Sequence, residues 1–269
     1  MAIPIVVAGA AGRMGGRIIC LAVDDPELEV VGCFERAGHP LAGREAGQVT
    51  SCGPIGLKIA SGLAEVIERA EVIIDFTQPE ASLMHLEAAA AKGKAIVIGT
   101  TGFSAEAMGT VRQLATRTRC VLAPNMSVGV NVLFKVVAEV ARVLGAGYDI
   151  EIVEAHHRMK KDAPSGTAVK LAQVAAEALG RNLDRVGRYE RKGIIGARPA
   201  DEIGVQTMRG GDIVGEHTVM FAGIGERLEL IHRAHSRDNF ARGALRAAKW
   251  VVGQQPGLYD MQDVLGLKG

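Results

Sequence analysis

Residues 5–17 read Ile5-Val6-Val7-Ala8-Gly9-Ala10-Ala11-Gly12-Arg13-Met14-Gly15-Gly16-Arg17. The four apolar residues predict a short buried strand, and the residues after the glycines predict a helix. Glycines at positions 9, 12 and 15 allow a tight turn, a close approach of backbone to a pyrophosphate and close packing of helix on strand. The helix N-terminus directs backbone N–H groups at such an anion, so the stretch predicts a dinucleotide-binding loop.

The position of this loop supports that interpretation. Its spacing is G-x-x-G-x-x-G, with Ala11 where the commoner fingerprint has its second glycine. A second apolar run ends at Glu35 and Arg36, about 20 residues beyond Gly15, where the Rossmann fold places the residue that selects the cofactor. Glu35 can accept a hydrogen bond from the ribose 2′-hydroxyl of NAD, and Arg36 can pair with the 2′-phosphate of NADP. We therefore expect both NADH and NADPH to be used.

Apolar runs alternate with helical stretches through the first 125 or so residues. Expected strands are 5–8, 29–34, 72–76, 95–98 and 120–123, and expected helices are 13–23, 79–92 and 104–116. These strands are apolar on both faces, which is typical of a buried parallel sheet. Two loops follow strands of this sheet, Gly99-Thr100-Thr101-Gly102 and Ala123-Pro124-Asn125-Met126. Ligands bind at the carboxyl ends of such strands, so these loops either line the nicotinamide half of the cofactor site or are ordinary connections.

The pattern changes after Asn125. A helix is expected over 130–144 and a strand over 149–154, whereas the alternation of polar and apolar residues over 203–234 predicts half-exposed antiparallel strands. No period is visible over 182–198, which predicts a long loop, and the apolar face of a final helix, 240–252, predicts packing on the first domain. The expected fold is α/β: a Rossmann-like dinucleotide-binding domain (1–126 plus 237–269) and a second α+β domain on a mixed or antiparallel sheet (127–236).

The densest chemistry lies in residues 151–168, which read Glu151-Ile152-Val153-Glu154-Ala155-His156-His157-Arg158-Met159-Lys160-Lys161-Asp162-Ala163-Pro164-Ser165-Gly166-Thr167-Ala168. A histidine exchanges protons near neutral pH, and a lysine among other cations gives up its proton more readily. Gly166 and Thr167 open a helix, where backbone N–H groups and a hydroxyl form a cradle for a carboxylate, and better for a dicarboxylate. The block predicts acid–base chemistry beside a hydride donor.

Other site types find less support. His156 and His157 are adjacent, so on a strand they point to opposite faces, and with no third ligand at the usual spacing we expect no metal site. The other histidines are scattered and receive no role: His39, His85, His217, His232 and His235.

With 31 Lys and Arg against 30 Asp and Glu, the net charge of +1 argues against nucleic acid and membrane partners. No apolar run is long enough to span a bilayer and no basic leader is present, so a cytoplasmic protein is expected.

The sequence closely resembles the 4-hydroxy-tetrahydrodipicolinate (dihydrodipicolinate) reductase family almost from end to end. The family pattern E-[IV]-x-E-x-H-x-x-x-K-x-D-x-P-S-G-T-A is met at every fixed position from Glu151 to Ala168. Further matching segments are Val7 to Gly15, Asp75-Phe76-Thr77, Val97 to Phe103, Ser127 to Asn131, and Gly210 to His217.

The resemblance implies hydride transfer from NADH or NADPH to a cyclic imine dicarboxylate, with loss of its 4-hydroxyl as water, in the diaminopimelate route to lysine. It implies that His156 donates and accepts protons, that Lys160 protonates the electron-rich intermediate, and that His157, Gly166 and Thr167 contact the substrate carboxylates. It also implies a homotetramer associating through the second domain. The cofactor contacts that it implies are Gly9, Ala10, Ala11, Gly12, Arg13, Met14, Glu35, Arg36, Gly99, Thr100, Thr101, Ala123, Pro124, Asn125 and Met126.

Two other functions are compatible with the first domain alone. One is a different NAD(P)-dependent dehydrogenase acting on a precursor of an aspartate-family amino acid, and the other is a non-enzymatic NAD-binding regulator. The His156-His157-x-x-Lys160 and Ser165-Gly166-Thr167 cluster argues against the other dehydrogenase, because a fold is widely shared and only the site decides. In the regulator the same cluster would bind a dicarboxylate merely as a signal, and loss of turnover in Lys160→Ala would argue against it.

Overall fold

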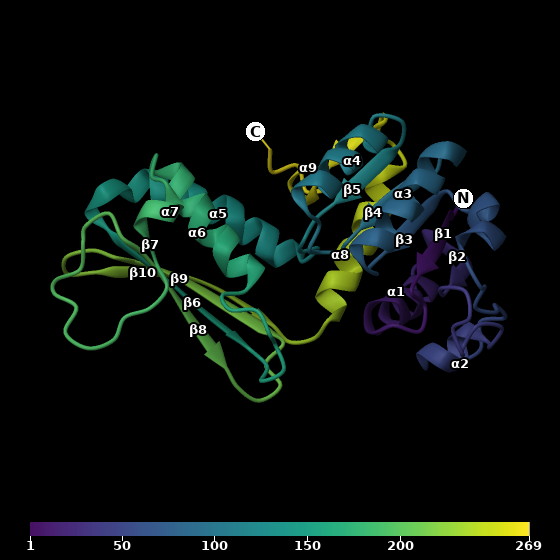
Figure 1. The fold of residues 1–269 in the computed structure, drawn as a ribbon, viewed down its shortest axis with the longest axis horizontal. Coiled ribbons are helices and arrows are strands. Elements are labelled where there is room, and N and C mark those ends of the chain that lie inside the picture. The colour runs from purple at the N-terminus through teal and green to yellow at the C-terminus, as the bar shows by residue number, and fades with distance from the viewer. Residues whose placement is uncertain (269) are drawn as a thin grey trace. The chain divides into compact units, whose positions relative to one another are not determined.

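The computed structural model describes residues 1–268. The chain forms two units, one made of Met1–Val128 with the segment from Arg237 onward, and the other of Gly129–Ser236. A six-stranded sheet, parallel throughout, forms the centre of the first unit, as predicted (Figure 1). In spatial order its strands are β11 (Gly257–Tyr259), β5 (Arg119–Leu122), β4 (Ala95–Ile98), β3 (Val72–Asp75), β1 (Ile3–Ala8) and β2 (Leu28–Phe34).

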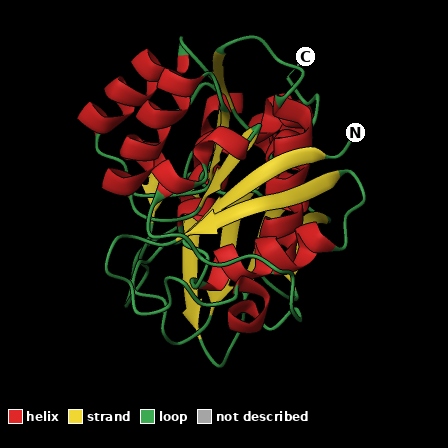
Figure 2. Ribbon diagram, turned by 90° about the vertical axis from the view of Figure 1, so that its right-hand side faces the viewer, coloured by secondary structure: helices red, strands yellow, loops and turns green. Residues whose placement is uncertain are grey.

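Helices cover both faces of this sheet because its strands are apolar on both sides. On one face, Ile5, Val7 and Ile74 pack in a buried cluster with residues of α1 (Arg13–Val23) and α8 (Asp238–Val251). On the other, Val6 and Ile73 pack with residues of α3 (Pro79–Lys92) and α4 (Ala105–Ala115). Figure 2 shows the strand that begins near the N-terminus beside a second strand, with helices packed behind the pair. The shorter helices of this unit are α2 (Ala46–Thr50), the 3₁₀ turns η1 (Leu63–Glu65) and η2 (Ile67–Arg69), and α9 (Met261–Val264).

The C-terminal segment completes the first unit, as its apolar face predicted. Helix α8 buries Ala244, Leu245 and Ala248 against this sheet. Strand β11, which was not predicted, adds a three-residue edge strand beside β5.

The second unit is a mixed five-stranded sheet with helices over one face. Its strands, in spatial order, are β10 (Arg227–Ala234), β9 (Gly215–Ala222), β6 (Asp149–His156), β8 (Ile203–Arg209) and β7 (Gly187–Arg188). Its helices are α5 (Val128–Leu144), the 3₁₀ turn η3 (Gly145–Gly147), α6 (Gly166–Ala178) and α7 (Leu183–Val186). Alternate residues of β6, β8 and β9 pack with α5 and α6 in one buried cluster that includes Ile152, Val205 and Phe221.

Two expectations for this unit were wrong. Strand β8 runs parallel to β6, not antiparallel, because the connection between them contains α6 and crosses back over the sheet. The region 182–198 is not entirely a loop, since it begins with one turn of helix, α7, and the two residues of β7. Strands β9 and β10 are antiparallel as expected, and Gly223-Ile224-Gly225 lies in the turn between them.

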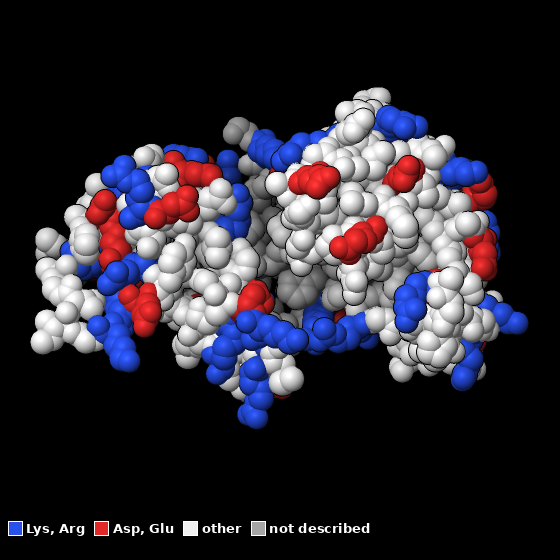
Figure 3. Space-filling view, viewed as in Figure 1, with Lys and Arg blue, Asp and Glu red and all other residues white. Residues whose placement is uncertain are grey.

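Charge on the surface is mixed in sign. Lys and Arg side chains are interspersed with Asp and Glu on the face that Figure 3 shows, in keeping with the net charge of +1. Within residues 1–268, the helices are all too short or too polar to cross a bilayer.

Candidate active site

The glycine loop after β1 is shaped by close contact between the turn and helix α1. Gly9 has φ +65°, a conformation that favours glycine, and its carbonyl accepts from the Gly12 N–H at 2.9 Å. A Cβ added at Gly15 would lie 2.1 Å from the Gly9 carbonyl oxygen. Only glycine fits at position 15, so the first turn of α1 lies directly against the loop, as an anion site at a helix N-terminus requires.

A cavity of about 920 Å³ opens beside this loop. Gly9, Gly12, Arg13, Met14 and Gly15 line one part of it, and Glu35 and Arg36, which follow β2, line another. Strand β1 lies between β2 and β3, so the cavity sits at the carboxyl ends of strands where the order of the sheet reverses. The residues present therefore fit a dinucleotide.

Within this cavity, Glu35 is already oriented by the glycine loop. Its Oε1 accepts a hydrogen bond from the Ala11 N–H at 3.0 Å. Ala10 is fully buried, and its N–H donates to the carbonyl of Phe34. Hence the loop after β1 and the end of β2, predicted separately from sequence, are joined by direct contacts.

The last residue of β3, Asp75, is a buried carboxylate beside the same cavity; it belongs to a segment that matches the family but was given no role from sequence. Asp75 is fully buried, and its Oδ1 accepts from the Thr77 N–H at 2.8 Å and hydroxyl at 2.6 Å. Its Oδ2 lies 2.7 Å from His85 Nδ1 on α3. Both Thr77 and His85 line the cavity, so His85, which received no role from sequence, belongs to its wall.

The other expected cofactor residues lie at the ends of β4 and β5, and are not among the residues that line this cavity. Thr100 is buried and accepts a hydrogen bond from the Ser82 hydroxyl at 2.8 Å, whereas Thr101 is exposed. A Cβ at Gly99 would overlap the ring of Phe76. After β5, Pro124 is exposed, and Asn125 accepts from the Ser127 N–H at 2.9 Å. Ala123 and Met126 are buried in the core of the unit.

In the second unit, His156 ends strand β6 and is held by a buried carboxylate. Its Nδ1 lies 2.6 Å from Oε2 of Glu154, two residues earlier on the same face of the strand. Arg209, at the end of β8, donates to both oxygens of Glu154, at 2.8 and 2.9 Å. Burial lowers the pKa of His156, and the Glu154 carboxylate partly opposes that shift.

Helix α6 begins close to His156, so the N–H groups expected to bind a carboxylate lie near this histidine. Ser165 caps the helix: its Oγ accepts from the Ala168 N–H at 3.1 Å, and its own N–H donates to Glu154 Oε1 at 2.9 Å. Gly166 and Thr167 form the first turn of α6. The N–H groups of a first turn have no acceptor within their own helix, so they suit an anionic ligand.

His217, which received no role from sequence, belongs to this cluster. Its Nε2 lies 3.1 Å from Ser165 Oγ, and its ring packs edge-on against that of His156, with 5.2 Å between centroids. Burial, with the charge of His156 adding to it, lowers the pKa of His217 to about 3. His217 is therefore a neutral imidazole that shares one hydrogen bond with the Ser165 hydroxyl.

His157 and Lys160 lie in the loop between β6 and α6. The His157 N–H donates to the carbonyl of Ile213 at 2.8 Å, and the Arg158 N–H to that of Gly211, which ties this loop to the connection between β8 and β9. The Lys160 ammonium lies 2.9 Å from Asp162 Oδ2. The structure thus gathers the predicted catalytic and substrate residues into one region of the second unit.

Comparison with known proteins gives consistent results. Residues 3–126 match the family model for the N-terminus of dihydrodipicolinate reductase, and residues 129–265 match that for its C-terminus. A 4-hydroxy-tetrahydrodipicolinate reductase of Syntrophobacter fumaroxidans is 61% identical over 97% of this chain and 98% of its own length. One from Syntrophus aciditrophicus is 60% identical over 98% of each chain.

Solved structures agree on the fold. A dihydrodipicolinate reductase from Paenisporosarcina, with dipicolinate bound, superposes with a TM-score of 0.76 at 26% identity, covering 98% of this chain and 99% of its own. An amine dehydrogenase from Mycobacterium smegmatis is similar in fold alone, with a TM-score of 0.60 at 13% identity, over 96% of this chain and 94% of its own.

Proposed function

The chain belongs to the dihydrodipicolinate reductase family, and from this premise we propose that its catalytic groups are those gathered around His156 in the second unit. The chain is an NAD(P)H-dependent oxidoreductase of the diaminopimelate route to lysine. It reduces 4-hydroxy-tetrahydrodipicolinate, a small cyclic dicarboxylate, to tetrahydrodipicolinate with loss of water.

The first unit holds the cofactor in the cavity beside the glycine loop. Gly9, Ala10, Ala11, Gly12, Arg13 and Met14 bind the pyrophosphate, and Glu35 with Arg36 receive the adenosine ribose. Gly99 to Thr101 and Ala123 to Met126 are assigned to the nicotinamide half because they end neighbouring strands of the same sheet. The bound nicotinamide supplies the hydride.

The second unit holds the substrate and moves its protons. The first-turn N–H groups of Gly166 and Thr167, together with His157, bind the carboxylates. His156 accepts and donates a proton, and the Lys160 ammonium protonates the electron-rich intermediate. The observation that supports this assignment is the link of close polar contacts from His156 through Glu154 to Ser165, because it joins a titratable imidazole to the first turn of α6.

Substitution of these residues tests the assignment. His156→Gln and Lys160→Ala should each lower kcat by at least about 100-fold, the scale of general acid–base catalysis, while the far-ultraviolet circular dichroism is unchanged. Lys58→Ala changes an exposed lysine of the first unit that does not line the cavity, and as the control it should keep wild-type turnover. Wild-type kcat in either site variant would contradict the role of that residue.

We also assign the second unit to self-association as a homotetramer. Helices α5 and α6 cover one face of its sheet, and Met208 and Ile231 are exposed on the other. Ile194 is fully exposed, in the loop between β7 and β8. Large apolar side chains left in water on one unit are typical of a surface that binds another protein chain.

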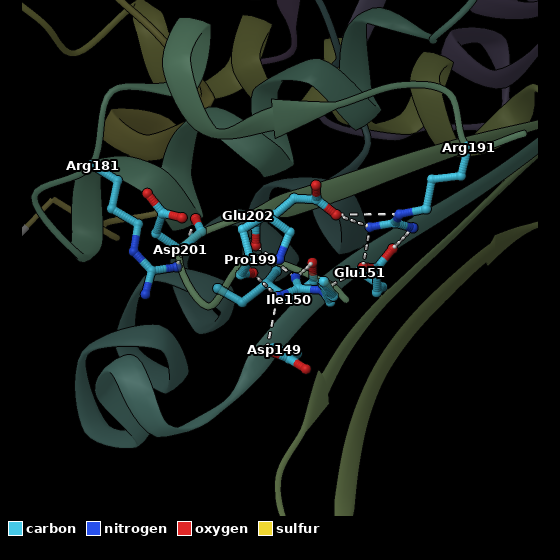
Figure 4. Close-up of polar contacts among 9 residues, drawn as sticks. Asp149, Ile150, Glu151, Arg181, Arg191, Pro199, Asp201 and Glu202 are labelled. Carbon is cyan, nitrogen blue, oxygen red and sulfur yellow. Dashed lines mark hydrogen bonds and ion pairs between the residues drawn. The ribbon is translucent and has the colours of Figure 1, made fainter. Parts of the chain in front are cut away.

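Ion pairs anchor the exposed loop between β7 and β8 to the sheet, which suits a binding surface. Arg191 donates to both oxygens of Glu151 on β6, at 2.6 and 2.8 Å, and is also paired with Glu202 (Figure 4). Arg198 donates to Glu151 at 3.0 Å and to Asp149 at 2.7 Å. Two guanidinium groups therefore fix the ends of the loop that carries Ile194. We also assign this biosynthetic enzyme to the cytoplasm.

A further inference from the structure

Glu154 was not among the predicted site residues, yet its carboxylate makes several polar contacts there. Its Oε2 lies 2.6 Å from His156 Nδ1 and accepts from Arg209 at 2.8 Å. Its Oε1 accepts from the Ser165 N–H at 2.9 Å, from Arg209 at 2.9 Å and from the Thr207 hydroxyl at 3.2 Å. One carboxylate thus joins β6, β8 and the start of α6.

The charge state of Glu154 decides what it does to His156. The side chain is fully buried, and burial by itself raises its pKa. The hydrogen bonds from Arg209, His156 and Ser165 outweigh burial and lower the pKa to about 2. At neutral pH Glu154 is therefore an anion that only accepts hydrogen bonds. The proton between Glu154 and His156 must then belong to Nδ1 of the imidazole.

We propose that Glu154 is a positioning residue that fixes His156 as the Nδ1–H tautomer and leaves the Nε2 lone pair for proton transfer. This inference rests on the proposed catalytic role of His156. Through the Ser165 N–H, the same carboxylate also fixes the first turn of α6, so the proton acceptor and the carboxylate cradle keep one geometry.

The surroundings of Nε2 are consistent with this role. A Cβ added at Gly215 on β9 would lie 3.0 Å from His156 Nε2, so glycine at this position keeps the atom uncrowded. The charged and titratable groups facing His156 are Glu154 on β6, Lys160 in the following loop, Arg209 on β8 and His217 on β9. Burial and the two cations lower the pKa of His156, and only Glu154 raises it. Neutral His156 is thus favoured at pH 7.

The tautomer can be read directly on the full-length wild-type protein labelled with ¹⁵N in its histidine rings. At pH 7.5 we expect the His156 resonances, assigned by their loss in His156→Gln, to show a protonated Nδ1 and an unprotonated Nε2. A protonated Nε2 with an unprotonated Nδ1 would overturn the proposal. This measurement requires no variant at Glu154, so it decides the question even where such a variant fails to fold.

Kinetics give an independent test. Glu154→Gln should lower kcat by about 10- to 100-fold, as loss of an orienting partner typically does. It should also move the acid limb of the pH profile of kcat/KM to lower pH, because the charge that stabilises the imidazolium is removed. Arg209→Gln should move that limb to higher pH, because a cation is removed. A lower rate with an unmoved limb in both variants would mean a merely structural role and would overturn the proposal.

Two controls separate the possible failures. Glu151→Gln changes a carboxylate on the same strand that is also held by guanidinium groups but does not contact His156, and should leave the acid limb where it is. If His156→Gln keeps wild-type turnover, the proposed function itself is wrong. If His156→Gln is inactive while Glu154→Gln matches the wild type in rate and pH profile, only the positioning role is wrong.

Discussion

Glu35 and Arg36 stand side by side at the end of β2 and line the same cavity, with opposite charges. Arg36→Ala removes the group that pairs with a 2′-phosphate, so it should lower kcat/KM for NADPH by about 10- to 100-fold and change that for NADH by less than about threefold. Initial rates with each nucleotide measure this.

The reciprocal variant serves as the control for that experiment. Glu35→Gln should lower kcat/KM for NADH more than kcat/KM for NADPH, because the neutral amide is a poorer acceptor for the ribose hydroxyl. Equal losses with both nucleotides in both variants would contradict selection by these two residues.

His217 makes the stability of the protein depend on pH. Its pKa lies below the ordinary 6.5, at about 3, so the unfolded chain binds a proton that the folded one excludes. Stability is therefore complete above pH 6.5 and falls by about 1.4 kcal/mol per pH unit as pH drops toward 3. Glu154 adds a further loss from pH 4.5 down to about 2.

Urea unfolding between pH 7.5 and pH 5 tests this sign. His217→Gln keeps a polar partner for the Ser165 hydroxyl but cannot be protonated, so its midpoint should fall less steeply with acid than that of the wild type. His235→Gln changes an exposed histidine and should follow the wild type. A parallel fall in all three proteins would rule His217 out as the cause.

At the scale of single residues, spacing along the chain predicted the candidate site residues but not the residues that hold His156 in place. His156, Lys160 and Gly166 lie within one short stretch, so the sequence places them together. Glu154 is two residues before His156, and strand alternation alone puts both on one face. Arg209 comes from another strand, and no spacing along the chain reveals that β8 lies beside β6.

Among the elements, α1 depends most on one residue. Gly15→Ala forces a Cβ into the Gly9 carbonyl, so the loop must move, and we expect destabilisation of about 1–3 kcal/mol with weaker binding of both nucleotides. Gly109→Ala, in the middle of α4 with open space around it, is the matched control and should stabilise by about 0.5–1 kcal/mol. Urea midpoints and nucleotide titration measure both; unchanged binding in Gly15→Ala would contradict the loop assignment.

Helices and strands that a local sequence pattern specifies were predicted well. Strands whose existence or direction depends on pairing with a distant part of the chain were not. Buried strands such as β3 and β4 are apolar throughout, and α1 follows its glycine loop directly, so their patterns suffice. The alternation in β8 fits either strand direction, and only the crossover through α6 makes it parallel to β6. Likewise β11 has only three residues, and it forms because it pairs with the edge strand β5.

For the molecule as a whole, self-association is the property that the sequence predicted only through resemblance. Ile231→Glu places a charge on the sheet face opposite α5 and α6, so it should lower the solution mass from four times the 28.3 kDa of one chain. Val143→Glu, at an exposed position on α5, is the control and should keep the wild-type mass in light scattering. A wild-type mass in Ile231→Glu would exclude this face as the interface.

The reaction itself is tested most directly with the wild-type protein. The unstable imine can be generated in the cuvette from pyruvate and aspartate semialdehyde by the condensing synthase, while nicotinamide absorbance is followed with NADH and NADPH separately. We expect oxidation of both nucleotides that requires every component of the mixture. No oxidation of either nucleotide by folded protein that still binds them would contradict the assigned activity.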